Sequence, residues 1–456
     1  MKQQLFFRQI IFLYLFSLSI FLFGQNNTWQ PLGPDDSSQP SFGTSDVTSL
    51  TMAPNGTLYF GYRDYVNNSK ATVKKFNGTN WETVGTEGFS DGIISQIDLT
   101  TAPDGTPYIA YQDYANGSKL TVKKFNGTSW ETVGIQGFTS SGPIFISLVI
   151  APDGTPYVGY SDNNNNKKAT VMKFNGTIWE TVGTLGFSAG DAQYVNVAVA
   201  QNGTLYAGYR DIVSGGKATV KKFNGTSWET VGISGFSVDL SAMYVSLVIA
   251  PNGTPYIGYS DFNDSEKTTV MKFNGTSWET VGPAQFSAGT AIFTNLAIAS
   301  DGIPYIAYAD GINNMKTTVK KFDNNNWVTI GTPGFSAGGV NYNVDLVISP
   351  DNKKIIAGYS LSASNGVFAR YYDAGELSIK ETSILNSGIY PNPVKGELNI
   401  KTEKKIKLCT LFDMAGRIIL TTSSQKINVS ALTKGIYMLN IQFADGTSLS
   451  QKVMKE

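Results

Sequence analysis

Six aspartates recur at one position of a repeated sequence, and their type and spacing could bind a ligand. Each follows a short apolar stretch and opens a loop of variable sequence: Asp64, Asp113, Asp162, Asp211, Asp261 and Asp310. A ring of carboxylates could bind a cation or sugar hydroxyls. Alternatively, each Asp accepts N–H bonds within its own turn, as Asp commonly does. Arg63 and Arg210 precede two of these aspartates and break the repeat, so we add them to the ligand-binding candidates.

The composition argues against most catalytic chemistry. The chain has no histidine and a single cysteine, Cys409, so the usual proton-transfer bases and disulfides are missing. Without histidine, catalysis would need two opposed carboxylates, and no Asp or Glu stands apart from the repeat. The segment from Asp162 to Asn166 lacks the central Gly and closing Glu of a calcium loop. We therefore predict no enzyme activity, no cofactor and no metal.

A tryptophan repeat determines the architecture that must position these residues. The tryptophans lie at 81, 130, 179, 228, 278 and 327, spaced by 49, 49, 49, 50 and 49 residues. Each of the first five stands in a phrase such as Phe125-Asn-Gly-Thr-Ser-Trp-Glu-Thr-Val-Gly134, and the sixth phrase is degenerate. Self-similarity at 40–50 residues with four short strands per period is typical of a β-propeller blade.

Each period predicts four strands. In the second period they span 94–102, 107–112, 120–125 and 130–134, with Asp104-Gly105 and Asn126-Gly127 at two hairpin turns. The hairpins are uniform on one face of such a blade, whereas the loops of the opposite face vary in sequence. Variable loops on a constant scaffold are where recognition usually occurs. We therefore expect the ligand on the face that carries the six aspartates.

The ends of the repeat region predict how the ring closes. Residues 335–372 contain three strands of a last unit but no Trp phrase, and the missing piece is Thr28-Trp29-Gln30-Pro31-Leu32-Gly33. We predict an all-β fold: a seven-bladed β-propeller over residues 26–373, closed by strand 28–33. Gly-Tyr pairs such as Gly61-Tyr62 and Gly159-Tyr160 make the blade resemble those of kelch and galactose-oxidase-like propellers, which implies a shared architecture.

The N-terminus and the charge distribution indicate an exported protein. Lys2 and Arg8 precede an apolar stretch from Ile10 to Phe23, which predicts a signal peptide over residues 1–24. Residues 25–378 hold 22 basic and 29 acidic side chains, a net charge of −7. Such a body repels phosphate backbones, so nucleic acid is not an expected partner. We expect a monomer.

The last 70 residues follow a different pattern. After a linker at 374–388, they carry a Tyr-Pro-Asn-Pro opening, an Asp-x-x-Gly-Arg turn and a Gly-Ile-Tyr strand, followed by a basic tail. This run closely resembles the type A C-terminal sorting domain of the type IX secretion system of Bacteroidota. The resemblance implies an immunoglobulin-like β-sandwich at 389–456, recognised by the outer-membrane secretion machinery and removed after export. The matching residues are Tyr390, Pro391, Asn392, Pro393, Asp413, Gly416, Arg417, Gly435 and Tyr437.

Three functions remain open on the sequence alone. The first is a secreted or cell-surface binding protein whose propeller face recognises a glycan or a protein. The second is a carboxylate-based glycan lyase or hydrolase on the same scaffold, and carboxylates of raised pKa in a central funnel would favour it. The third is a purely structural or adhesive surface protein.

Overall fold

The computed structural model describes residues 28–33, 43–238, 241–262, 266–374, 388–402, 404–413, 417–444 and 448–456. The chain divides into two compact units, Met1–Gly375 and Glu376–Glu456. The predicted signal peptide, residues 375–387 of the predicted linker and Gly416 of the sorting motif lie outside the described residues. In the described ranges, no helix is long and apolar enough to cross a membrane.

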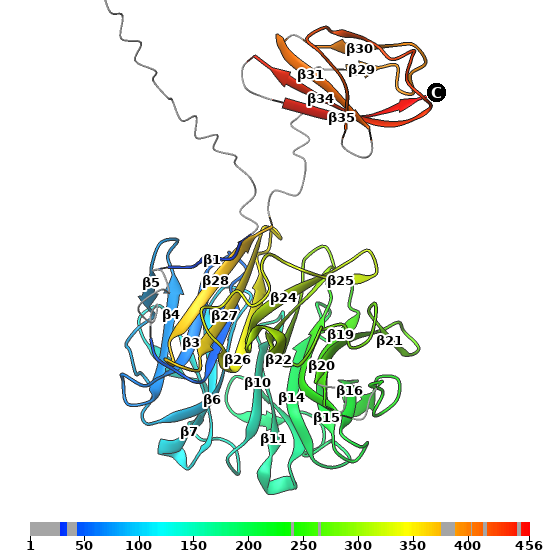
Figure 1. Ribbon diagram of the computed structural model, residues 1–456. Helices are drawn as coiled ribbons and strands as arrows, with labels where there is room; N and C mark the ends of the chain where they lie inside the picture. Colours follow the sequence, from blue (N-terminus) through cyan, green and yellow to red (C-terminus); the bar gives the residue numbers. More distant parts are fainter. Residues whose placement is uncertain are drawn as a thin grey trace, which may run out of the picture. The chain divides into compact units, whose positions relative to one another are not determined.

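The first unit consists of seven four-stranded antiparallel sheets arranged as the blades of a propeller (Figure 1). The innermost strands are β2 (Thr48–Met52), β6 (Ile94–Thr101), β10 (Ile144–Ile150), β14 (Ala192–Val199), β18 (Ala242–Ile249), β22 (Ala291–Ile298) and β26 (Val340–Ile348). The second strands are β3 (Leu58–Asp64), β7 (Pro107–Asp113), β11 (Pro156–Asp162), β15 (Leu205–Asp211), β19 (Pro255–Asp261), β23 (Pro304–Asp310) and β27 (Lys354–Leu361). The prediction of an all-β propeller with seven blades is confirmed.

The two outer strands complete each blade. The third strands are β4 (Lys70–Phe76), β8 (Lys119–Phe125), β12 (Lys168–Phe174), β16 (Lys217–Phe223), β20 (Lys267–Phe273), β24 (Lys316–Asp323) and β28 (Val367–Asp373). The outermost are β5 (Trp81–Thr83), β9 (Trp130–Thr132), β13 (Trp179–Thr181), β17 (Trp228–Thr230), β21 (Trp278–Thr280), β25 (Asn326–Thr329) and β1 (Gln30–Pro31). Three short 3-10 helices, η1 (Tyr114–Asn116), η2 (Asn163–Asn165) and η3 (Gly311–Asn313), follow the second strand in three blades.

The seventh blade combines both ends of the propeller sequence, in the order β1-β28-β27-β26. Gln30 pairs with Tyr371 and Pro31 with Arg370, and blue β1 lies beside yellow β28 in Figure 1. Trp29 is buried and stacks on Phe335 with ring centroids 4.0 Å apart. The chain therefore returns to its own beginning, and the sheet contains segments more than 300 residues apart.

The repeated tryptophans join each blade to the one before it. The indole Nε1 of Trp130 donates to the carbonyl oxygen of Val84 at 2.8 Å, and that of Trp179 to Val133 at 2.8 Å. The same bond closes the circle, because Trp29 donates to Ile330 at 3.0 Å and Trp81 donates to Leu32 at 2.7 Å. Each indole thus satisfies its polar group while it packs between two sheets.

The glycine of the Gly-Tyr pair allows the inner strands to approach closely. A Cβ atom on Gly208 would lie 3.2 Å from the Cβ of Leu247 in the next blade, and one on Gly258 would lie 3.1 Å from Ile306. Both distances are tighter than ordinary van der Waals contact, so a larger side chain would push neighbouring blades apart. This explains why only Ala110 and Ala307 replace the glycine in this position.

The second unit is a small β-sandwich of two sheets. One sheet has the order β29-β30-β33, with bounds Gly388–Tyr390, Glu397–Lys401 and Lys426–Asn428. The other has the order β32-β31-β34-β35, with bounds Ile418–Thr422, Ile406–Asp413, Gly435–Phe443 and Ser448–Lys455. The inner faces of the two sheets enclose a core that includes Cys409 and Leu439.

Candidate functional site

The six repeated aspartates are buried, and their carboxylates serve their own loops. Asp113 accepts from the backbone N–H of Ala115, the side-chain amide of Asn116 and the hydroxyl of Thr121, at 3.1, 2.8 and 2.8 Å. Equivalent bonds hold the other loops, including those from Thr72 to Asp64, Asn164 to Asp162, Thr219 to Asp211, Gln285 to Asp261 and Thr318 to Asp310. This geometry supports the turn-forming interpretation of the aspartates over the cation ring.

The two arginines that break the repeat are also partnered. Arg63 forms an ion pair with Asp46 and donates to the hydroxyl of Tyr65 at 3.1 Å. Arg210 donates to Gln193 at 2.6 Å and to Ser241 at 2.9 Å. The charge of Arg210 also lowers the pKa of Tyr194, although burial raises it more, to about 12. Arg210 pairs across the blade with Gln193, the residue before Tyr194.

A central channel runs along the seven innermost strands. Its first cavity, of about 560 Å³, lies where these strands begin, and further hollows of about 440 and 450 Å³ follow along them. The strands begin on the side of the six aspartate loops, so the first cavity opens on the variable face. We call this cavity the funnel.

Aromatic side chains form a collar around the funnel. They come from one position in five consecutive blades: Phe145, Tyr194, Tyr244, Phe293 and Tyr342. Neighbouring rings contact one another, with centroids 4.7 Å apart between Phe145 and Tyr194 and 5.2 Å between Tyr194 and Tyr244. Val47 and Gln96 occupy the wall in the first two blades, so the collar is interrupted there.

A β-bulge points the collar residues into the funnel. The pairing register of the first two strands shifts at this point in six blades, and the first blade has no such shift. The φ angles of Phe145, Tyr194 and Tyr244 are 55°, 51° and 51°. A bulky residue at positive φ is uncommon and costs about 1–3 kcal/mol, and such strain concentrates at ligand sites. Bulges are also a common means of redirecting a side chain.

A belt of polar side chains lies next to the collar, two or three residues further along the innermost strands. It consists of Ser49, Asp98, Ser147, Asn196, Ser246, Asn295 and Asp345, one from each blade. Several of these accept a backbone N–H from the next blade: Ser49 from Leu99 at 3.0 Å, Asp98 from Leu148 at 2.6 Å, and Asn196 from Leu247 at 3.0 Å. The belt therefore joins the blades on the inside of the ring, as the tryptophans do further out.

Asp98 and Asp345 are the charged side chains among the described residues that line the funnel. Burial raises the pKa of Asp98 to about 7, against the lowering effect of its bonds with Leu148 and Ser49. Burial also raises the pKa of Asp345 well above its usual range, and the charge of Asp98 raises it further. Only the first blade separates them: the hydroxyl of Ser49 lies 3.3 Å from Asp98, and that of Thr48 lies 3.5 Å from Asp345.

The sequence did not single out the collar, Asp98 or Asp345. We expected no Asp or Glu to stand apart from the repeat, and that expectation was wrong, because the belt position carries Asp in only two blades. The signal was a lack of repetition at a fixed spacing, since Asp98 aligns with Ser49 and Ser147, 49 residues away on either side. Among the described residues, no three acidic or cysteine side chains are grouped to hold a metal ion.

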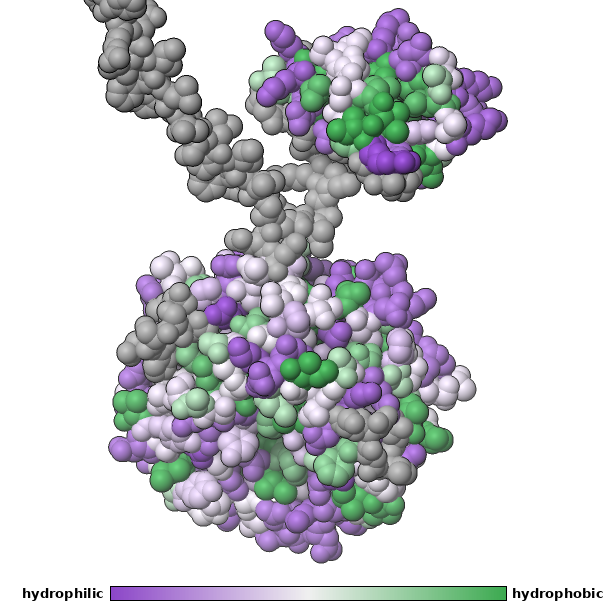
Figure 2. Space-filling model, viewed as in Figure 1, coloured by the Kyte–Doolittle hydropathy of each residue, from purple (hydrophilic) through white to green (hydrophobic). Residues whose placement is uncertain are grey.

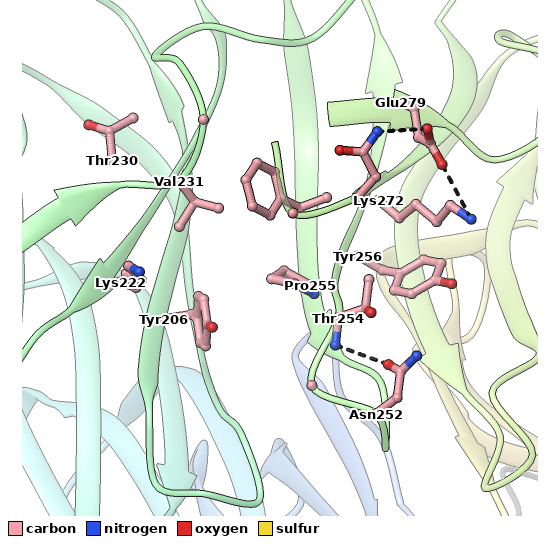
Figure 3. Close-up of a pocket in the computed structure, with 15 residues that line it drawn as sticks. Tyr206, Lys222, Thr230, Val231, Asn252, Thr254, Pro255, Tyr256, Lys272 and Glu279 are labelled. Atoms are coloured by element: carbon pink, nitrogen blue, oxygen red, sulfur yellow. Dashed lines mark hydrogen bonds and ion pairs between the residues drawn. The ribbon is translucent and has the colours of Figure 1, made fainter. Parts of the chain in front are cut away.

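A second kind of hollow lies between blades on the opposite face (Figure 3). The groove between the fourth and fifth blades has a volume of about 550 Å³, with Tyr206 on one wall and Tyr256 and Pro255 on the other. Lys272 and Glu279 pair at its rim at 3.4 Å. A smaller groove of about 250 Å³ lies between the third and fourth blades. These grooves are built from repeated residues.

Exposed apolar residues mark the variable face. Of the large hydrophobic side chains exposed in the described propeller, most belong to the loops of that face: Tyr65, Val66, Ile93, Tyr114, Ile135, Leu185, Val213, Ile233, Val238, Phe262, Ile312 and Met315. On the hairpin face, the corresponding residues are Ile178 and Val328. Figure 2 shows hydrophobic residues scattered among hydrophilic ones over the visible side of the propeller. The excess of exposed apolar loops distinguishes the face that carries the funnel.

The sorting-motif residues lie at three places in the sandwich: beside the last strand, at the turn between β31 and β32, and in β34. Asn392 donates to the carbonyl oxygen of Lys452 at 2.7 Å and accepts from the backbone N–H of Met454 at 2.8 Å. Asp413 accepts from the backbone and the side chain of Arg417, at 3.0 and 2.7 Å. The hydroxyl of Tyr437 donates to the carbonyl oxygen of Thr433 at 3.0 Å. The motif residues therefore fix local turns and the final strand.

Comparison with protein families identifies this unit, because residues 388–456 match the secretion system C-terminal sorting domain. The second unit is a type IX secretion sorting domain. This domain indicates export to the cell surface or the exterior and implies interaction with the secretion machinery. No curated protein sequence matched the chain.

Solved propellers resemble the first unit. The BP39L lectin of Burkholderia pseudomallei matches at 12% identity with a TM-score of 0.54, over 73% of this chain and 97% of that one. A mutant of the Aleuria aurantia lectin in complex with Fucα1-6GlcNAc matches at 13% identity and a TM-score of 0.42, over 64% and 97%. An α-L-arabinanase of Penicillium chrysogenum matches at 13% identity and a TM-score of 0.41, over 76% and 98%. At such identity the lectin match shows the fold alone.

Proposed function

We propose that the exported propeller is a glycan-binding module and that its ligand occupies the funnel. The aromatic collar carries this proposal. The C–H faces of a sugar ring are apolar and pack against aromatic rings, while nearby amides and hydroxyls bond the sugar hydroxyls. Gln96, Asn196 and Asn343 provide such groups in the wall. Gln96 and four of the five collar residues share a positive φ at the bulge, and all of them line the funnel, which supports a role in ligand binding.

The proposal includes the route to the cell surface. Residues 1–24 direct export across the inner membrane, and the sorting domain at 389–456 engages the type IX machinery of the outer membrane. Both segments are then removed, and the propeller acts at the cell surface or after release. A reporter fused to residues 374–456 tests the second step: we expect it outside the cell, and retention in the periplasm would refute it.

A glycan array followed by titration calorimetry tests the binding site. We expect the double variant Tyr194→Ala/Tyr244→Ala to weaken binding of the array-selected glycan about tenfold or more, because it removes two contiguous rings of the collar. The matched control is Tyr206→Ala/Tyr256→Ala, which removes two partly buried tyrosines from the groove on the opposite face. If the control abolishes binding and the collar variant does not, the groove is the site and the funnel assignment is wrong.

A second candidate function, glycan cleavage, is favoured by Asp98 and Asp345. Paired carboxylates with raised pKa are the groups that glycan hydrolysis without histidine would need. Release of new reducing ends from the bound polysaccharide tests this alternative. Binding alone predicts no release; release that is lost in Asp98→Asn would establish the enzyme. The kelch-like classification and the prediction of a non-enzyme stay predictions.

A further inference from the structure

The two carboxyl groups accept hydrogen bonds from several donors, including Leu148 to Asp98 and Asn343 to Asp345, but neutral side chains accept equivalent bonds in other blades. At the same belt position Ser49 and Asn196 accept the N–H of the next blade without a charge. Three blades carry Ser there and two carry Asn. A carboxylate held in a desolvated wall with no cation beside it still costs free energy, and the raised pKa values of Asp98 and Asp345 reflect that cost. Asp98 and Asp345 have no Lys or Arg beside them in the described funnel wall.

The funnel is also asymmetric. Its aromatic side chains come from the third to the seventh blades, while Asp98 and Asp345 belong to the second and seventh blades and flank Ser49 and Thr48 of the first. The carboxylates therefore lie on the side where Val47 and Gln96 interrupt the collar. One side of the funnel is aromatic, and the other carries two ionisable carboxyl groups.

This arrangement suits a ligand with an apolar face and a cation. A cation near the two carboxyl groups reduces the repulsion between their charged forms. It therefore lowers both pKa values and favours the deprotonated carboxylates. Aromatic rings within about 6 Å of a cation attract it further. A neutral ligand gains the contacts with the collar but brings no positive charge to the two carboxyl groups.

We propose that the funnel binds an amino sugar, with its free ammonium group at Asp98 and Asp345 and its ring against the collar. This inference rests on the proposed glycan-binding function and specifies its ligand class. Binding displaces protons from the two carboxylates, since the ammonium favours their charged forms. Proton release is a property that a neutral sugar in the same funnel would not show.

Titration calorimetry with three tetrasaccharides of the same length tests the inference on the full chain. They are β1,4-linked glucosamine, N-acetylglucosamine and glucose. At pH 5.5 the glucosamine amines are ammonium groups, while the Asp98 carboxyl, with its pKa of about 7, holds its proton. At this pH we expect the glucosamine tetramer to bind at least about tenfold more tightly than the other two. In buffers of different ionisation enthalpy, the apparent enthalpy of its binding should vary as protons are released. The other two tetramers should show no such variation.

Two variants of equal charge complete the test. Asp98→Asn/Asp345→Asn keeps an acceptor at the belt, as Asn196 does naturally, and should abolish the preference for glucosamine. Glu229→Gln/Glu279→Gln removes two exposed carboxylates outside the funnel and should leave the preference unchanged. Equal binding of all three tetramers, weakened by Tyr194→Ala/Tyr244→Ala, would overturn the inference while the proposed function stands. If no glycan in the array or the titrations bound, both would be refuted.

Discussion

The substitution Trp29→Ala tests whether the segment at β1, the first strand of the propeller sequence, holds the ring closed. Trp29 is 4% exposed, stacks on Phe335 at 4.0 Å and donates to Ile330 at 3.0 Å. Removing a buried Trp costs about 3–5 kcal/mol, and an unpaired carbonyl adds about 1–3 kcal/mol. We therefore expect a loss of about 4–8 kcal/mol in the free energy of unfolding. The shift of the midpoint of urea unfolding, monitored by far-ultraviolet circular dichroism, measures this loss.

The chain provides a matched control in Trp179→Ala. Trp179 is similarly buried, stacks on Phe138 at 4.4 Å and donates to Val133 at 2.8 Å, but it lies within a continuous blade. If closure is real, the two variants lose similar stability. If the short terminal strand frays, as chain ends often do, Trp29→Ala costs less than about 1 kcal/mol while Trp179→Ala keeps its full effect. That result would refute the closure argument.

Deleting residues 28–33 extends the test. The deletion also removes buried Leu32, its bond to Ala369 at 2.9 Å and the acceptor of the Trp81 indole. Loss of the Leu32 contacts adds about 2–5 kcal/mol, so the total approaches the whole stability of a typical domain, about 5–15 kcal/mol. We expect the deleted protein not to fold, although only six residues are missing.

Three further predictions follow from single groups. In the folded state Asp98 keeps its proton up to about pH 7, because its pKa is raised to about 7, whereas an unfolded Asp loses its proton near pH 4. The free energy of unfolding therefore falls as the pH rises from about 4 to about 7. Urea midpoints at pH 5 and pH 8 should differ less in Asp98→Asn than in the parent. Asn392→Ala removes two hydrogen bonds that fix the last strand. This loss should destabilise the sorting domain by about 1–3 kcal/mol and reduce the extracellular fraction of the protein. Unchanged secretion of a destabilised variant would show that Asn392 serves the stability of the domain and not its recognition by the secretion machinery. Lys272→Ala breaks an exposed ion pair, and its effect on the urea midpoint should stay within about 0.5 kcal/mol.

The repeat made the fold predictable because each blade carries the same sequence signals for strands and turns. The Trp spacing, the Asn-Gly turns and the Gly-Tyr pairs each recur, so one correct interpretation applies seven times. The strand bounds differ by a residue or two; the outermost strand of the second blade spans Trp130–Thr132 rather than 130–134. The residues after Thr132 turn away, and Val133 instead donates to Val122 from outside the ladder.

The site was not predictable in the same way, because it depends on what the repeat brings together across the ring. Asp98 and Asp345 are 247 positions apart in the sequence, and only closure of the circle places them on either side of the first blade. The left-handed backbone of Tyr194 and Tyr244 is also invisible in the sequence, since nothing in these residue types signals a bulge. The variable face was expected to carry the ligand, but its repeated aspartates are occupied by their own turns.

In this propeller, repeated residues and residues that differ between blades have different roles. Positions with the same residue in nearly every blade, such as Asp113 and Trp130, have contacts that each blade needs for itself. Positions where the residue changes while the backbone geometry persists, such as the belt and the collar, are free to differ because any acceptor or any bulky side chain keeps the ring intact. A charge placed at such a position is therefore tolerated by the scaffold without being required by it. The pair of half-buried Asp98 and buried Asp345 is the clearest instance, and the ammonium group of the proposed amino sugar would supply its positive counter-charge.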